Sequence, residues 1–423
     1  MRSTLRRPCV LALGRWNLGA VTHLDAIVVG SGLCGMLAAR HLEAAGRSVV
    51  VLEAGPALPE ATLPADVRGV QRAVAPVAER FTDEWAFRAP RGYTWHRVRA
   101  RGGRTLSGRR TSLHARLDRA SHVVGVKRES VLLGHAQMLT AADLSLRGTV
   151  RCGVPVVHLE AIRGGVAVHL AGGGVVIGRH VVLAASPIET ARVVEASLPV
   201  AQRRTRLPLA DHLIAGALAI AKREPVTAHP VGRSEASAVI HPVRGARLRF
   251  TTEVRGPTLL EFLDDEDLAN LGFTAEQARR HSFFVVFAIG ETDAHVPRTA
   301  ELTKSLDALG RPQPCFVTRR HTDEERRLAA RMNEQCLRIA RRLAQSPSNT
   351  FAIYDAEDFS SGGHELGICL DRVPPTGTAL ELPGVFVADG AAVPAATDRH
   401  PSLTLAANAL RVAEAVNSSL SSW

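Results

Sequence analysis

With 423 residues, of which 46% are hydrophobic and 22% charged, the chain has the composition of a folded globular protein, large enough for two domains or for one domain interrupted by another. A net charge of +11 makes a nucleic-acid or membrane-surface role worth considering. Only 4% of the residues are aromatic, however, and the sequence has neither a DNA-binding motif nor an apolar run of membrane-spanning length, so we predict no nucleic-acid or membrane partner.

Two features bear on cellular location: the first 24 residues and the cysteines. Residues 1–24 are expected to be a disordered extension, or to precede the true start of the protein. They are basic before Asp25, as export signals are, but Arg15 and Asn17 interrupt the apolar stretch and no clean cleavage site follows. The six cysteines form no C-x-x-C pair and no cluster with metal-ligand spacing, which favours a reducing, cytoplasmic setting and predicts no metal site.

The first predicted folded element is a strand, a glycine turn and a helix. The apolar strand Asp25–Val29 leads into Gly30, Gly32 and Gly35, which have the spacing G-x-G-x-x-G. In such a turn the first glycine allows a tight bend, the second leaves room for a pyrophosphate, and the third lets the helix pack closely on the strand. The free N–H groups and the positive dipole end of the helix can bind the phosphates.

A second apolar strand, Ser48–Leu52, follows the helix and ends in an acid. Glu53 comes eighteen residues after Gly35, where a carboxylate can accept hydrogen bonds from ribose hydroxyls. Both strands, the helix and the acid together predict a bound adenine dinucleotide in preference to a purely structural unit. The ending LEAG, near the start of the chain, resembles the flavoprotein version of this unit and indicates FAD.

A strongly basic segment, from Arg97 to Arg128, comes next. We interpret most of it as a solvated basic face. Within it, Gly102 and Gly103 lie among arginines, which gives a flexible backbone with cationic neighbours. Such a pair suits contact with a pyrophosphate or an isoalloxazine ring, although an ordinary surface turn would have the same pattern.

Short apolar runs separated by glycines predict a β-meander from Val150 to Ser186, which returns to the main sheet at Val181–Ala185. The glycines at 172–174 lack the spacing of a second dinucleotide motif and are interpreted as a hairpin turn. A separate nicotinamide-binding domain is therefore not expected.

Residues 201–320 contain strand-like segments such as ARLRFTTEV and HSFFVVFAIGE, and we interpret them as a substrate domain. The clearest helix of the chain follows, opened by a capping box of Thr322 and Glu325. Pro347 is expected to close it. Five apolar residues at helical spacing predict its buried face: Leu328, Met332, Cys336, Ile339 and Leu343.

Two histidines near the C-terminus have distinctive settings. His364 lies in a loop flanked by glycines, and His400 precedes Pro401 at the start of a predicted helix. A strand, Val385–Ala388, stands between them. A lone histidine in such a loop is more often a cap or a packed core group than a catalytic residue. Apolar spacing predicts the buried face of the last helix: Leu403, Ala406, Leu410, Ala413 and Val416.

Four segments together resemble the glucose-methanol-choline (GMC) oxidoreductases, FAD-dependent enzymes that oxidise alcohols. They are GSGLCG with LEAG, RARGGRTLSGR, VVLAASPIETARVVEAS, and HELGICL with GVFVADGAAVPAATDRHPSLTLAANALR. The resemblance implies an α/β fold in which a Rossmann-type FAD-binding domain (residues 25–200 and 351–423) carries an inserted α+β substrate domain (residues 201–350) built on an antiparallel sheet. Ser107 lies near the place where some relatives attach FAD through a histidine, so we expect non-covalent FAD.

The resemblance also implies roles for individual residues. His364 and His400 match the active-site pair of the family. Asp389 and Gly390 match residues beside the ribityl–phosphate chain. With the glycine turn, its acid and the neighbours implied by position, the expected cofactor-binding residues are Gly30, Gly32, Gly35, Glu53, Gly102, Gly103, Val157, Ala185, Asp389, Gly390, Pro401 and Ser402.

The expected reaction is oxidation of an alcohol. One imidazole takes the hydroxyl proton while the carbon gives hydride to N5 of the flavin, and the other orients the oxygen; the sequence leaves open which histidine is the base. The substrate (a sugar, a polyol or a natural-product hydroxyl) and the electron acceptor (oxygen or another) also stay open. The alternatives are FAD-dependent oxidation of an amine or a C–C bond, and a flavin-binding protein without turnover.

Overall fold

The structure of the protein is a computed structural model. It describes residues 24–57, 93–95, 101, 146–222, 236–240, 247–260, 265–296, 298–307, 309–317, 320–356, 360–362, 364–373, 381–394 and 398–422. The predictions made for residues 1–23, for the basic segment from Arg97 to Arg128 apart from Arg101, and for Gly102, Gly103 and Ser107 within it, lie outside this part of the chain.

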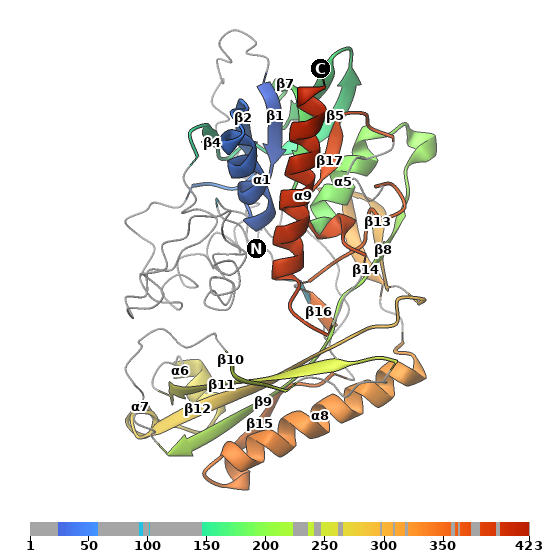
Figure 1. Ribbon diagram of the computed structural model, residues 1–423. Coiled ribbons are helices and arrows are strands. Elements are labelled where there is room, and N and C mark those ends of the chain that lie inside the picture. The colour runs from blue at the N-terminus through green and yellow to red at the C-terminus, as the bar shows by residue number, and fades with distance from the viewer. Residues whose placement is uncertain are drawn as a thin grey trace, which may run out of the picture.

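A seven-stranded sheet occupies the upper half of the molecule in Figure 1. Its order is β4-β2-β1-β7-β6-β5, with β17 also paired to β7. The strands are β1 (Leu24–Val29), β2 (Val49–Leu52), β4 (Thr149–Arg151), β5 (Val156–Ile162), β6 (Gly165–Leu170), β7 (Val175–Leu183) and β17 (Val385–Val387). β1, β2, β4, β7 and β17 are parallel, whereas β5, β6 and β7 form the predicted antiparallel meander. The glycines at 172–174 make its hairpin turn, where Leu170 N–H donates to the Gly174 carbonyl at 2.8 Å.

The central strands are apolar throughout because both of their faces are covered. Alternate residues of β1 and β2 pack under α1 (Leu33–Ala44) and α9 (Ser402–Ser421), and the others pack toward α5 (Pro187–Ser197). The predicted face of α9 is wrong at Leu403, which is exposed, because it lies in the first turn, before the helix reaches the sheet at Ala406. The residues of α9 that are buried are Ala406, Ala409, Val412, Ala413, Val416 and Leu420.

Antiparallel sheets built largely from the middle of the chain complete the structure. The larger one contains β3 (Tyr93–Trp95), β9 (Leu213–Lys222), β10 (Ala236–Ile240), β11 (Phe250–Leu259), β12 (His281–Gly290), β15 (Thr350–Tyr354) and β16 (Ser360–Gly362). The smaller one contains β8 (Arg206–Leu209), β13 (Arg298–Leu306) and β14 (Pro312–Val317). The short helices are α6 (Asp265–Asn270), α7 (Ala275–Ala278), η4 (Val200–Gln202), η6 (Pro347–Asn349) and η7 (Gly390–Ala392). The predicted fold class, a Rossmann-type α/β unit with an inserted antiparallel sheet, is confirmed.

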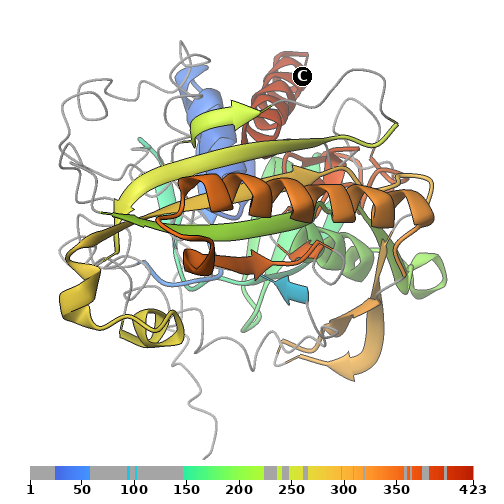
Figure 2. The ribbon, with the colours of Figure 1, turned by 90° about the horizontal axis from the view of Figure 1, so that it is seen from below.

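One face of the larger antiparallel sheet is covered by α8 (Asp323–Leu343), which crosses in front of the strands in Figure 2. Small residues of β9, at alternate positions from Ala215 to Ala219, meet Leu328 and Met332 of the helix. The predicted capping box is present: Glu325 N–H donates to Thr322 Oγ1 (3.2 Å), and Thr322 N–H donates to Glu325 Oε2 (2.9 Å). The helix ends at Leu343, before Pro347, which starts η6 instead.

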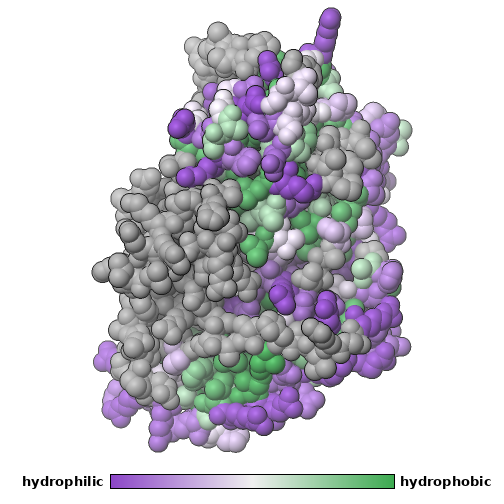
Figure 3. Space-filling view, in the orientation of Figure 1, coloured by the Kyte–Doolittle hydropathy of each residue, from purple (hydrophilic) through white to green (hydrophobic). Residues whose placement is uncertain are grey.

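The outward side of α8 is hydrophilic, as Figure 3 shows along the lower edge of the molecule. Its exposed positions include Arg327, Arg331 and Arg338. None of the helices in the described part of the chain has the length and apolar character needed to cross a membrane.

Helix α5 is joined to the end of β13 by buried ion pairs. Arg192 contacts Glu189 in its own helix (Nη1–Oε1, 2.9 Å) and Asp307 (Nη2–Oδ2, 2.6 Å), and Arg311 also contacts Asp307 (3.1 Å). Burial by itself would raise the pKa of the Asp307 carboxyl, but the charges of Arg311 and Arg192 lower it. Asp307 therefore stays charged in the interior, and these ion pairs fix the helix to the smaller sheet.

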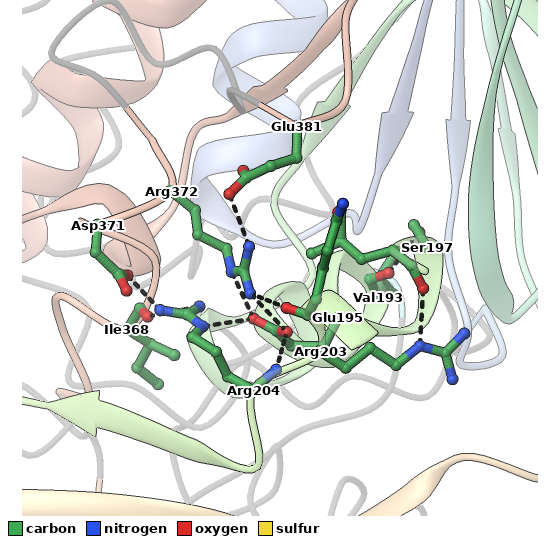
Figure 4. A network of polar contacts seen from close by, with 11 residues as sticks. Val193, Glu195, Ser197, Arg203, Arg204, Ile368, Asp371, Arg372 and Glu381 are labelled. Atoms are coloured by element: carbon green, nitrogen blue, oxygen red, sulfur yellow. Dashed lines mark hydrogen bonds and ion pairs between the residues drawn. The ribbon is translucent and has the colours of Figure 1, made fainter. Parts of the chain in front are cut away.

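A second group of ion pairs lies one turn further along α5 (Figure 4). Glu195 accepts hydrogen bonds from Arg204 (2.7 Å) and from Arg372 (2.9 Å). Arg372 also contacts Glu381 (2.7 Å), and Arg204 contacts Asp371. These contacts hold the segment that follows His364 against α5.

Loss of the α8 cap should be measurable. We expect Thr322→Ala to lower the free energy of unfolding by about 1 kcal/mol, because the N–H of Glu325 loses its acceptor. Urea denaturation measures this change. Thr322→Ser keeps the oxygen and should remain within a few tenths of a kcal/mol of the wild type; an equal loss in both variants would contradict the role of the cap.

The glycine turn gives a sharper contrast. A Cβ on Gly35 would overlap the carbonyl oxygen of Gly30, whereas a Cβ on Gly32 would have no heavy atom within 4 Å. We therefore expect Gly35→Ala to destabilise the fold by about 3 kcal/mol and Gly32→Ala to change stability by less than about 1 kcal/mol. Thermal unfolding of the two variants tests the difference, and equal stabilities would be inconsistent with this packing.

Candidate functional site

The glycine turn lies at the carboxyl end of β1, between β2 and β7. Gly30 has φ +99°, its N–H donates to the Leu52 carbonyl (2.8 Å), and a Cβ on it would overlap the carbonyl oxygen of Ala184. Such a conformation suits glycine. Helix α1 begins after Gly32 without any side-chain cap and without an acid in its first turn. The space at Gly32 and the uncapped N–H groups suit a ligand that carries phosphates.

Glu53 is buried and connects the end of β2 to the glycine turn. Its Oε2 accepts from the N–H (2.9 Å) and the hydroxyl (2.7 Å) of Ser31, and its Oε1 accepts from the N–H of Gly55 (2.7 Å). A carboxylate at the end of this strand is where the ribose hydroxyls of a dinucleotide bind in such folds. Arg101 and Cys152 lie nearby: burial and the charge of Glu53 raise the pKa of the Cys152 thiol to about 11, although Arg101 opposes the shift.

The turn between β7 and α5 borders the glycine turn. Ser186 has a positive φ of +83°, and among the described residues no other non-glycine residue has a positive φ. Its buried hydroxyl has no hydrogen-bond partner among these residues. Ala185 N–H donates to Thr190 Oγ1 (3.2 Å). Val157 lies on β5, three residues after Val154, whose N–H donates to the Glu53 carbonyl (2.8 Å).

Asp389 and Gly390 follow β17 and join α5 to the loop of His364. Asp389 Oδ2 accepts from Thr190 Oγ1 (2.6 Å), and its Oδ1 caps η7 by accepting from Ala391 N–H (2.9 Å). A Cβ on Gly390 would come within 2.8 Å of the carbonyl oxygen of Glu365. The backbone is therefore packed tightly where the Rossmann sheet meets the segment of His364.

The structure brings His364 and His400 together. Their ring centroids are 5.4 Å apart, with the rings nearly perpendicular. The segment that carries His364 is held in place two residues further on, where Leu366 exchanges two backbone hydrogen bonds of 2.9 Å with Ala210. The second ring stands immediately before Pro401 and Ser402, where α9 begins. Two imidazoles at this separation can act on one small group.

Sequence reasoning missed a third histidine. His212 is fully buried, and its ring centroid is 5.0 Å from that of His364, again nearly perpendicular. It lies just before β9, where Asp211 and His212 form a polar pair between two apolar strands. That pair was the available signal. No group of three histidine, cysteine, aspartate or glutamate side chains in the described residues is arranged to hold a metal ion.

His400 is bordered by the face of the antiparallel sheet that α8 leaves uncovered. Arg255 Nη2 lies 3.0 Å from His400 Nε2, and Glu253 Oε2 lies 3.7 Å from the same nitrogen. The ring of Phe287 is parallel to the imidazole, with centroids 6.1 Å apart. On the same strand, Thr251 donates to Asp398 (3.0 Å). Three alternate residues of β11 thus meet the loop that carries His400.

The pair formed by Glu253 and Arg255 is buried and ionised. Burial by itself would raise the pKa of the Glu253 carboxyl, but its contact with His400 and the charge of Arg255 lower it to about 2. Two imidazoles, one of them beside a buried ion pair, can take a proton from a hydroxyl group and position its oxygen near neutral pH.

Comparisons with known proteins support the fold. Residues 28–58 match the family model of the NAD(P)-binding Rossmann-like domain, a range that includes the glycine turn and Glu53. No curated protein sequence matches the chain. The solved structure of pyridoxine 4-oxidase from Mesorbium loti is similar with a TM-score of 0.58 over 93% of this chain and 99% of that chain, at 15% sequence identity. At this identity the similarity shows a shared fold.

The low pKa of Glu253 predicts a pH dependence of stability. Its carboxyl titrates near pH 2 in the folded protein and has a usual pKa of 4.5. It therefore stabilises the fold above pH 4.5, and this contribution is lost as the pH falls through about 2. Glu253→Gln should reduce the slope of unfolding free energy against pH in that window, as urea denaturation would measure. Glu276→Gln, at an exposed pair with Arg280, is the control and should keep the wild-type slope.

Proposed function

We propose that this protein is an FAD-dependent oxidoreductase of the GMC type that oxidises an alcohol. The proposal is carried by one observation: the ring centroids of His364 and His400 lie 5.4 Å apart, and the segment of His364 packs against Gly390, which follows β17 of the Rossmann sheet. The resemblance of the sequence segments to that family and the similarity of fold to a pyridoxine 4-oxidase agree with it.

The described residues suit FAD. Gly32 leaves space beside the uncapped start of α1, Glu53 stands at the end of β2 where an acid binds a ribose, and the buried hydroxyl of Ser186 is free to bond a ligand at the next turn. Asp389 and Gly390 stand between these turns and the two histidines. When bound, FAD supplies the acceptor for the hydride that leaves the carbinol carbon.

The chain's own residues contribute proton transfer and orientation. A neutral imidazole of His364 or His400 takes the hydroxyl proton, and the other ring positions the oxygen by a hydrogen bond. The first turn of α9, after Pro401 and Ser402, contains no acidic residue, so its free N–H groups stabilise negative charge that develops beside it. The substrate is an alcohol, and the electron acceptor is oxygen or another oxidant.

The cofactor can be tested directly. We expect the purified protein to show the absorption bands of oxidised flavin, and acid precipitation to release the yellow colour into the supernatant, since the flavin is held non-covalently. Gly32→Ala should fold and bind less flavin, because its methyl group occupies the open space. A colourless protein that takes up no FAD would overturn the proposal, and colour retained in the pellet would show a covalent link.

The histidine pair can be tested by flavin reduction. We expect His364→Ala and His400→Ala to keep bound FAD and to slow its reduction by an alcohol about 10²- to 10⁴-fold, the usual contribution of a general base. His295→Ala, at an exposed position, is the matched control and should reduce at the wild-type rate. An unchanged rate in both site variants would remove the alcohol mechanism. Faster reduction by amines would favour the alternative donor.

A further inference from the structure

We propose that Arg255 and Glu253, on strand β11, are positioning residues with opposite effects on His400: Arg255 keeps the ring neutral with its proton on Nδ1, and Glu253 limits how strongly protonation is opposed. Only the predicted effects on turnover depend on the proposed function. The protonation form itself follows from the contacts of this chain and can be measured without any reaction.

The direction of the Arg255–His400 hydrogen bond fixes the tautomer. Arg255 Nη2 lies 3.0 Å from His400 Nε2. A guanidinium is charged at every relevant pH and can only donate hydrogen bonds, so Nε2 must be the acceptor. An imidazole that accepts at Nε2 and is neutral carries its proton on Nδ1. Nδ1 then carries the proton and cannot accept another, so in the proposed reaction His400 orients the substrate oxygen and His364 takes the hydroxyl proton.

The carboxylate of Glu253 gives this nitrogen a second partner of opposite sign. Its Oε2 is 3.7 Å from Nε2 and also accepts from Arg255 Nε at 3.1 Å. If Nε2 gains a proton, it faces a donor in Arg255 and an acceptor in Glu253. Arg255 therefore opposes the imidazolium and Glu253 favours it, and the balance between them sets how readily His400 is protonated.

Burial makes both effects strong. The side chains of Arg255 and Glu253 are 5% and 9% exposed, and that of His400 is 19% exposed. Charges so little screened by water interact over a lower effective dielectric than surface pairs do. The ring of Phe287, parallel to the imidazole, and the Arg255 guanidinium, 5.5 Å from the centroid of Phe287, hold the three groups in one arrangement.

The other charged or titratable groups around His400 come from two loops. His364 faces it from the loop after β16, with 5.4 Å between ring centroids. Asp398 and Arg399 belong to its own loop; Asp398 is bonded to Thr251, and Arg399 is exposed. Arg255 and Glu253 both lie within 4 Å of His400 Nε2.

The first test is the tautomer of His400. Nitrogen-15 NMR of protein labelled at histidine, as purified, distinguishes a ring protonated at Nδ1 from one protonated at Nε2, and His400→Gln identifies the signal by its loss. We expect the Nδ1–H form at neutral pH in the wild type. The Nε2–H form, or an imidazolium, would overturn the proposal even if the protein oxidises alcohols.

The second test uses the opposite signs of the two charges. Arg255→Met should raise the pH at which half of the His400 rings are protonated by about one unit or more, and Glu253→Gln should lower it by a similar amount. If FAD binds and turnover is seen, the acidic limb of kcat/KM against pH should move in the same two directions. Arg280→Met, at an exposed pair with Glu276, is the control and should leave both unchanged.

The outcomes separate this inference from the proposed function. Loss of FAD binding would overturn the function while leaving the NMR test valid. If Arg255→Met and Glu253→Gln lose activity equally and do not shift the protonation of His400 in opposite directions, the two residues have a purely structural role and the inference is overturned. If Arg255→Met does not fold, Arg255→Lys keeps the charge without the planar fork, and it should retain the Nδ1–H form with a weaker opposition to protonation.

Discussion

The pairing of β7 with two other strands is the constraint on which the arrangement depends. Val181 to Leu183 pair in parallel with Ile27 to Val29 of β1 on one side and with Val385 to Val387 of β17 on the other. Parallel strands end at the same edge of a sheet, so the glycine turn after β1 and Asp389 after β17 lie at one edge. Residues more than three hundred positions apart thereby come to one site.

The two faces of the larger antiparallel sheet have different roles, because successive side chains of each strand point to opposite faces. On one face, small residues of β9 pack on α8 and make a core. On the other face, Thr251, Glu253 and Arg255 of β11 contact the loop of His400. Because side chains alternate at every residue, a single strand can serve both purposes, and a change of register by one residue would exchange them.

Buried ion pairs on α5 fix the geometry more than they add stability. Removing charges from water is costly, and well-paired interior ions roughly recover that cost. Arg192 with Asp307, and Glu195 with Arg372, instead specify where the smaller sheet and the segment after His364 lie against the Rossmann unit. That segment holds His364 in its place, so these pairs bear on the site from a distance.

The sequence by itself determined the local elements: the glycine turn, the meander, the capping box of Thr322 and the strand before Asp389 are set by short-range spacing and backbone preference. It also named His364 and His400 through a resemblance. It did not find Glu253 or Arg255, because alternating charges on a strand have no local pattern that distinguishes a site from a surface. It also missed His212, although the polar pair Asp211-His212 between two apolar strands was a signal. Only tertiary structure, by docking one face of the antiparallel sheet against the loop before α9, decided which buried charges meet which imidazole.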